Sequence, residues 1–334
     1  MRFALSTEQL DFAAELRKIL EAGQIPAAVR AWSAGDTDKG RALLRQLAEM
    51  GVFGLIVDEK YDGADATPVD LVVALIETGR AALPGPVIES AAVIPALLQR
   101  LPDAGTAQQW LPGLASGESL GTITFDDPQR GIALDAAAAD LVLTATADRL
   151  ALGAGEEALS SIDPARKLVQ VAADATLAEG AETADALRHA FDVGVLACAA
   201  QLLGAGRAIL EQTTTYAKQR KQFGRVIGEF QAVKQQLADV LIALDLAEPL
   251  VYRAALTLDS ADRARDVSAA LVACGDAAHR AARVGLQVHG AIGYTAECDL
   301  SLWLTRVAAL RTAWGTADFH RGRIAAALRE PAAV

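Results

Sequence analysis

Residues 187–219 carry the pattern that most limits how this chain can fold. Apolar residues, mostly Ala, Leu and Val, occupy nearly every face of the helix that this segment would form. A helix at the surface keeps a polar face toward water, whereas a helix that is apolar all round must be enclosed by other helices. The segment therefore predicts a long central helix inside a helical bundle.

The segments that follow supply the partners that such a helix needs. Pro249 should kink the first of them, because proline has no N–H to donate inside a helix, and Gly290 should end the second. We expect these helices at residues 231–260, 264–288 and about 316–329, which completes a C-terminal four-helix bundle domain over residues 186–330.

The N-terminal third is also helical by its pattern. The stretch STEQLDFAAELRKILEA opens with a capping signal, in which Ser6 or Thr7 precedes Glu8 and Gln9, and continues with apolar residues at helical spacing. Further helices broken by Gly and Pro follow. Residues 1–117 are therefore expected to form an N-terminal α-helical domain.

The middle of the chain has a different composition. Short alternating or β-branched runs such as ESLGTITFDD and KLVQVAAD, separated by Gly, Pro and Asp, are typical of strands and turns. The pattern is confined to residues 118–185, where few strands fit. The expected fold is mostly α, with a reduced middle β-domain between two helical domains.

Composition and charge exclude several classes of function. The net charge of -11 argues against a nucleic-acid-binding protein, because neutralising phosphates requires a basic face. The three cysteines lie far apart without a CxxC or His–Cys cluster, which predicts buried thiols in a reducing compartment and no metal site. No apolar run approaches the roughly 20 residues that cross a bilayer, and the N-terminus has no signal-peptide pattern. We expect a cytoplasmic protein that does not insert into a membrane.

One short segment breaks the acidic character of the chain. The sequence YAKQRKQFGRVIGEFQ, residues 216–231, places Lys218, Arg220, Lys221 and Arg225 within eight positions. Cations in the last turn of a helix complement the helix dipole, and Gly224 would serve as a C-cap. The segment by itself thus fits either an ordinary helix end or a site for an anion.

The wider sequence resembles the acyl-CoA dehydrogenase superfamily. The signature helix–turn–helix of that family is similar to YAKQRKQFGRVIGEFQAVKQQLAD, and its Q-x-x-G-G-x-G-Y-x-x-E segment is similar to LQVHGAIGYTAECDLSLWLTR. The stretch LAEMGVFGLIVDEKYDG resembles its N-terminal motif. The resemblance is strong over residues 190–322 and weak over residues 118–185. It implies an FAD-dependent oxidoreductase that introduces a double bond between the α and β carbons of an acyl-CoA thioester.

The resemblance also implies a role for the basic segment. Arg220 and Phe223 would hold the pyrophosphate and adenine of FAD, since a guanidinium offers a planar fork of donors to a diphosphate. This clamp would reach across a subunit interface to an FAD seated mainly in a neighbouring chain. The other cofactor-binding residues that the resemblance implies are Gln231, Gln287, Gly290 and Thr316.

The catalytic carboxylate of the family is missing. Removing the α-proton requires a positioned base, and the family places a Glu at one of two positions, which are Trp314 and Gly194 in this chain. Neither residue can accept the proton. Asp318 and Asp192 are weak substitutes nearby, so no catalytic residue is assigned. The loops that cradle the flavin ring are reduced as well, because residues 121–131 are at most a remnant of the first of them.

These losses match one kind of family member. The chain resembles the short subunit of bacterial α₂β₂ acyl-CoA dehydrogenases, including those acting on steroid side chains, which lacks the Glu and completes the FAD site of a homologous full-length partner. The implied substrate is an acyl-CoA of fatty-acid or steroid β-oxidation, and the implied electron acceptor is an electron-transfer flavoprotein. Two alternatives remain. One is a self-sufficient homo-oligomeric flavoenzyme with Asp192 or Asp318 as base, and the other is a flavin-free acyl-CoA-binding scaffold.

Overall fold

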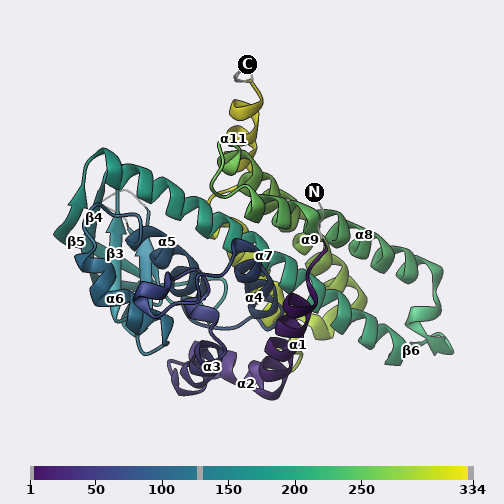
Figure 1. The fold of residues 1–334 in the computed structure, drawn as a ribbon. Helices are drawn as coiled ribbons and strands as arrows, with labels where there is room; N and C mark the ends of the chain where they lie inside the picture. Colours follow the sequence, from purple (N-terminus) through teal and green to yellow (C-terminus); the bar gives the residue numbers. More distant parts are fainter. Residues whose placement is uncertain (1–3, 126–130, 330–334) are drawn as a thin grey trace.

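The computed structural model describes residues 4–125 and 131–329. The chain runs from a helical region through a small sheet into a bundle of long helices (Figure 1). The mostly helical fold expected from the sequence is confirmed. The helices of the first region are α1 Thr7–Ala22, α2 Ile25–Ser33, α3 Asp38–Glu49, α4 Pro68–Arg80, α5 Ile94–Leu98 and α6 Gly105–Ala115. Those of the bundle are α7 Ala181–Gln219, α8 Gln231–Leu256, α9 Arg263–His289, α10 Leu300–Ala313 and α11 Ala317–Arg329.

The first helix begins as its capping signal predicts. The Ser6 hydroxyl accepts a hydrogen bond from the Gln9 backbone N–H at 3.3 Å, and the Gln9 side-chain oxygen accepts one from the Ser6 N–H at 3.0 Å. The Gln9 amide also donates to Asp70 at 2.8 Å, and Asp70 forms the capping box of α4 with Thr67. These bonds fix the start of α1 against the start of α4.

The middle region forms a five-stranded sheet in the order β1-β3-β4-β5-β2. β1 pairs with β3 in parallel, and the other pairings are antiparallel. The sheet lies near the N-terminal end of α7 (Figure 1). Positions 126–130, which belong to the expected loop remnant, lie outside the described residues. The strands are β1 Gly121–Thr124, β2 Ile132–Leu134, β3 Leu141–Ala145, β4 Arg149–Leu159 and β5 Leu168–Glu179.

The central helix is α7, which is 39 residues long. Every residue from 192 to 206 is buried, and α7 packs against α4, α8, α9 and α10. By length and composition α7 could cross a membrane, contrary to our estimate from the sequence, but 89% of its most apolar window is buried inside the protein. The prediction of an enclosed central helix is confirmed.

α4 and α7 cross with their backbones in contact. A Cβ added at Gly204 would overlap the carbonyl oxygen of Ile76, and a Cβ added at Gly79 would overlap the carbonyl oxygen of Gln201. Glycine permits this approach because it has no side chain to separate the two backbones. The crossing joins the N-terminal region directly to the core of the bundle.

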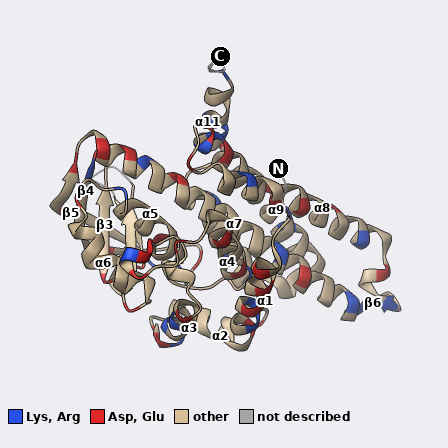
Figure 2. Cartoon of the chain, in the orientation of Figure 1, with Lys and Arg blue, Asp and Glu red and all other residues tan. Residues whose placement is uncertain are grey.

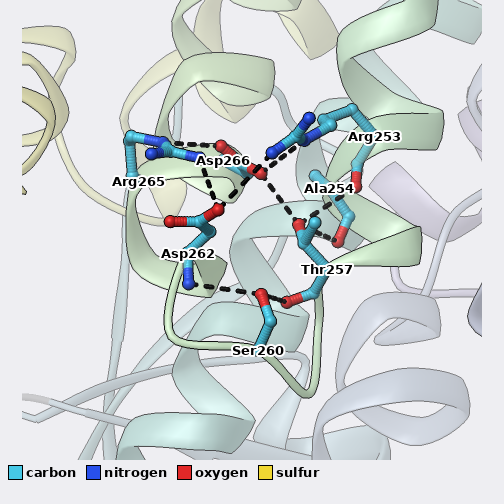
Figure 3. A network of polar contacts seen from close by, with 7 residues as sticks. All are labelled: Arg253, Ala254, Thr257, Ser260, Asp262, Arg265 and Asp266. Carbon is cyan, nitrogen blue, oxygen red and sulfur yellow. Dashed lines mark hydrogen bonds and ion pairs between the residues drawn. The ribbon is translucent and has the colours of Figure 1, made fainter. Parts of the chain in front are cut away.

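A polar network fixes the turn between α8 and α9 (Figure 3). Asp266 accepts hydrogen bonds from the side chains of Arg253 and Arg265, each at 2.8 Å, and of Thr257 at 3.0 Å. Burial alone would raise the pKa of Asp266, but the hydrogen bonds from Arg265, Arg253 and Thr257 lower it overall. The carboxylate therefore stays charged and holds the two longest helices after α7 together.

One helix of the bundle was not predicted. α10 makes the described part of the bundle five helices, α7 to α11, where the sequence predicted four. Its apolar residues are spread around the helix, so no single face marks it as amphipathic. Polar contacts dock it instead. Trp303 donates to the Arg80 carbonyl at 2.7 Å, and buried Arg306 donates to Asp163 at 2.5 Å and to the Leu83 carbonyl at 2.7 Å.

Candidate functional site

The basic segment folds into a hairpin at the end of α7. β6, Lys221–Gln222, and β7, Arg225–Val226, pair antiparallel and are joined by Phe223 and Gly224. Both joining residues have positive φ, 53° and 82°, as in a type I′ turn. Gly224 is therefore a turn residue and not the C-cap that the sequence suggested. Phe223 is 90% exposed. A bulky residue in the left-handed region is strained, and the Phe223 ring meets Phe230 edge to face, with ring centroids 6.2 Å apart.

The cations of the hairpin are available to an anion. Lys218, Arg220 and Lys221 are exposed, and among the described residues their side chains have no ion-pair partner. Figure 2 shows the basic residues gathered beside β6. The Arg225 guanidinium lies 4.2 Å from the centre of the Phe230 ring. Unpaired cations beside an exposed aromatic ring fit a diphosphate joined to a planar base, because the cations bind phosphate and the ring stacks on the base.

The C-terminal end of α9 lies beside the end of α7. Tyr216 of α7 stacks on His289 of α9, with ring centroids 4.2 Å apart. Gln287 and Gly290 are exposed there, and Gly290 has a φ of 67° with open space where a side chain would be. Gln231 is exposed and begins α8 directly after the hairpin. The structure thus places five of the six predicted cofactor-binding residues at one end of the bundle: Arg220, Phe223, Gln231, Gln287 and Gly290.

Thr316, the sixth residue, lies elsewhere, in the turn between α10 and α11. Its hydroxyl accepts a hydrogen bond from the Phe319 N–H at 3.2 Å. His320 is fully buried, and its two ring nitrogens contact the Trp314 carbonyl at 2.8 Å and the Ser268 hydroxyl at 3.0 Å. Burial lowers the pKa of His320, so the ring is neutral. These bonds hold the turn that presents Trp314.

Trp314 and Gly194, the two positions at which the resemblance places the catalytic Glu, touch each other. The Trp314 ring is buried and packs against Phe125 and Phe191, with centroid distances of 5.9 and 6.0 Å. A Cβ added at Gly194 would overlap this ring. The indole therefore occupies the space into which a side chain at position 194 would extend. With the indole in this place, a side chain at position 194 has no room.

The two substitute carboxylates differ sharply in their surroundings. Asp192 is 2% exposed and bridges two arginines, accepting from Arg263 at 2.9 Å and from Arg323 at 2.6 Å. Both of its oxygens are held by guanidinium groups, and it ties α7 to α9 and α11. Asp318 has a side chain that is 94% exposed and pairs with Arg321 at 3.3 Å. Neither carboxylate has the geometry of a general base in an enclosed site.

A cavity of about 640 Å³ lies between the sheet, α7 and the turn after α10. Trp314 lines it, together with Phe191 of α7 and Glu89, a buried carboxylic acid. Burial raises the pKa of Glu89 to about 7, an effect that nearby Arg166 opposes. The sequence analysis did not single out Glu89. The available signal was a lone acid inside the apolar run VIESAAVIPALL.

The hairpin and the cavity lie at different places along α7. Arg220 follows Gly194 by 26 residues, which at 1.5 Å per residue separates them by roughly 39 Å. Figure 1 shows the hairpin at the opposite end of α7 from the sheet. The described residues contain no cluster of potential metal ligands. The chain therefore offers two separate candidate sites, an exposed basic hairpin and an apolar cavity.

Comparison with protein families gives matches to both helical regions. The family model described as acyl-CoA dehydrogenase, N-terminal domain, matches residues 6–118. The model described as acyl-CoA dehydrogenase, C-terminal domain, matches residues 184–329. The chain is 32% identical to acyl-CoA dehydrogenase IpdE2 of Mycobacterium tuberculosis, over 84% of this chain and 85% of that protein.

Solved structures show the same fold. A chain of the ChsE4–ChsE5 complex of Mycobacterium tuberculosis matches with a TM-score of 0.85 at 23% sequence identity, covering 99% of both chains. A chain of the Tcur3481–Tcur3483 steroid ACAD, a G363A variant, matches with a TM-score of 0.83 at 23% identity, covering 98% of this chain and 99% of that one.

Proposed function

The chain belongs to the acyl-CoA dehydrogenase family of FAD-dependent flavoproteins, and we propose that it serves there as the subunit that completes the FAD site of a partner and supplies no catalytic base. The partner is a homologous full-length chain that carries the Glu and the flavin-ring site. The proposed reaction of the heteromer is the α,β-dehydrogenation of an acyl-CoA of fatty-acid or steroid β-oxidation. An electron-transfer flavoprotein is the proposed acceptor.

The contact between Trp314 and Gly194 carries this proposal. Trp314 itself stands at one of the two positions, and its indole fills the space into which a side chain at the other, Gly194, would extend. The double ion pairing of Asp192 and the exposure of Asp318 argue against the self-sufficient flavoenzyme. The exposed, strained Phe223 and the unpaired cations beside it argue against the flavin-free scaffold, which would not need them.

The position of the hairpin supports a role toward a neighbouring chain. Roughly 39 Å separates Arg220 from the Gly194–Trp314 contact, which is farther than one dinucleotide extends. The hairpin also projects beyond the bundle, at the opposite end of α7 from the sheet (Figure 1). It is thus placed to hold the adenine end of a cofactor whose ring lies in another subunit.

The outer face of α8 supports a stable partnership. Leu241, Ile242 and Leu246 are exposed apolar residues on this helix, and Leu246 is 71% exposed. A run of exposed apolar side chains on one helix is typical of a protein–protein interface. The ChsE4–ChsE5 neighbour was solved as a complex of two differently named chains. We propose a similar pairing for this chain.

In the proposed mechanism the chain binds and orients the cofactor. Bound FAD supplies the acceptor for the β-hydrogen of the substrate. The Arg220 guanidinium binds the diphosphate through charge-assisted hydrogen bonds, the Phe223 ring stacks on the adenine, and Gly290 allows the backbone to approach the cofactor closely. The partner's carboxylate removes the α-proton. The role of this chain is to hold the adenine end of FAD in a fixed position.

The isolated chain, supplied with FAD in excess, should show no acyl-CoA dehydrogenase activity with an artificial electron acceptor. The reason is that the two positions at which the resemblance places the base are Trp314 and Gly194, and neither residue can accept a proton. The measurement is acyl-CoA-dependent reduction of the acceptor over a series of straight-chain and steroid thioesters. Turnover of any of them by the purified chain would contradict the proposal.

Arg220→Glu should strip flavin from the assembled heteromer while both chains stay folded. The lost charge-assisted bond is worth on the order of 1.5–3 kcal/mol, and the new charge repels the diphosphate. Flavin absorbance per complex after gel filtration measures the occupancy. Lys221→Glu, which makes the same charge change in the same hairpin, is the matched control and should lose less flavin. If Arg220→Glu kept its full flavin content, Arg220 would be a cation that complements the end of α7 and does not bind FAD.

A further inference from the structure

The cavity beside Trp314 holds two charged side chains that the proposed function does not use. Glu89 lies on the π-helical turn Glu89–Val93 and is 4% exposed, while Arg166, shortly before β5, is 8% exposed. Both line the cavity. Most other lining residues are apolar, among them Ile123, Phe125, Ile132, Leu134, Ile162 and Phe191. The cavity is therefore an apolar space that contains one buried acid and one buried cation.

Glu89 has an atom without a partner. Its Oε2 is buried and has no hydrogen-bond partner among the described residues. Such atoms are few in native structures, because each costs the desolvation of a polar group. Burial raises the pKa of Glu89 to about 7, which favours the protonated acid, and this form can donate a hydrogen bond.

Arg166 is also unpaired, in contrast to its neighbour Arg306. The Arg306 guanidinium is satisfied by Asp163 and by the Leu83 carbonyl. The Arg166 side chain forms no hydrogen bond or ion pair within the described part of the chain. Its guanidinium nitrogens are not among the buried atoms that lack a partner, so they face the cavity that Arg166 lines. Glu89 and Asp135 are near enough to interact with it through their charges, but neither forms an ion pair with it. A bound anion could pair with this guanidinium.

We propose that this cavity binds an apolar organic acid, with its carboxylate between Arg166 and Glu89 and its apolar body against Phe125, Phe191 and Trp314. A guanidinium binds a carboxylate bidentately, and a neutral acid donates a further hydrogen bond to it. The volume of about 640 Å³ lies within the roughly 300–1,000 Å³ of small-molecule sites. The site is distinct from the FAD clamp, so it gives the base-less chain a ligand of its own.

The test uses the full chain with octanoate as probe and octanamide, which has the same length and no charge, as comparison. Calorimetric titration should show that octanoate binds and that octanamide binds with an affinity at least tenfold lower. Octanoate should raise the Tm of the chain, and octanamide should not. Arg166→Met should weaken octanoate binding about ten- to a hundredfold. This variant should fold, because it removes an unpaired buried charge. Glu89→Gln keeps a donor and should retain binding.

Three results would overturn the proposal: no octanoate binding, equal binding of the acid and the amide, or unchanged binding by Arg166→Met. Displacement of octanoate by riboflavin would also overturn it, since the cavity would then be a seat for a flavin ring. Arg220→Glu serves as the control variant and should bind octanoate as the wild type does. Octanoate binding therefore does not depend on whether Arg220 binds FAD, and FAD binding by Arg220 does not depend on whether the cavity binds octanoate.

Discussion

Replacing Trp314 with alanine should lower the free energy of unfolding of the isolated chain by about 3–5 kcal/mol, the usual cost of truncating a large buried aromatic residue. The indole packs against Phe125, Phe191 and the backbone of Gly194. Truncation leaves a void next to an existing cavity, and α7 cannot move inward to fill it because it is held on its other sides. Equilibrium denaturation in urea measures the loss.

A double-mutant cycle with Gly194 sharpens this test. Gly194→Ala alone should destabilise the chain by about 1–3 kcal/mol, because the added methyl overlaps the Trp314 ring. In the Trp314→Ala background the same methyl has room, so the two losses should sum to more than the loss of the double variant. Strict additivity would mean that the two residues are not in contact, and the argument for a lost base would lose its main support.

Glu89→Gln should change the free energy of unfolding differently at different pH. The difference between the variant and the wild type should be about 3 kcal/mol more favourable to the variant at pH 8 than at pH 4. The pKa of Glu89 rises on folding from its ordinary 4.5 to about 7. The folded state therefore holds a proton that the unfolded state has released, and wild-type stability falls as the pH rises from about 4.5 to 7. Glutamine cannot ionise, so the variant should not show this fall.

Urea denaturation of both proteins across this pH range measures the difference. Asp318→Asn is the matched control, since it removes a carboxylate whose side chain is 94% exposed. Asp318→Asn should show the same change in the free energy of unfolding between pH 4 and pH 8 as the wild type. If the Glu89→Gln and wild-type curves stay parallel, Glu89 is not the buried acid that the cavity site requires.

Features set by neighbours in sequence were predictable. The enclosed α7 and the capping of α1 follow from local patterns, and the basic residues of the hairpin stand next to one another in the chain. Features set by distant residues were not. Trp314 contacts Gly194, which lies 120 positions earlier in the chain. Arg306 pairs with Asp163 and so docks α10, but no pattern in the sequence links these two residues. Glu89 can be recognised in the sequence as a lone acid in an apolar run, but its raised pKa results from burial, which the sequence does not show.

The crossing of α4 and α7 bears on how the chain can be divided. The family models match an N-terminal and a C-terminal part separately, yet the carbonyls of Ile76 and Gln201 lie against glycines of the opposite helix. A single cluster of buried apolar residues also runs through both parts and the sheet. A fragment ending before the sheet would expose this backbone surface to water. The two parts are matched by separate family models, yet they share one buried core.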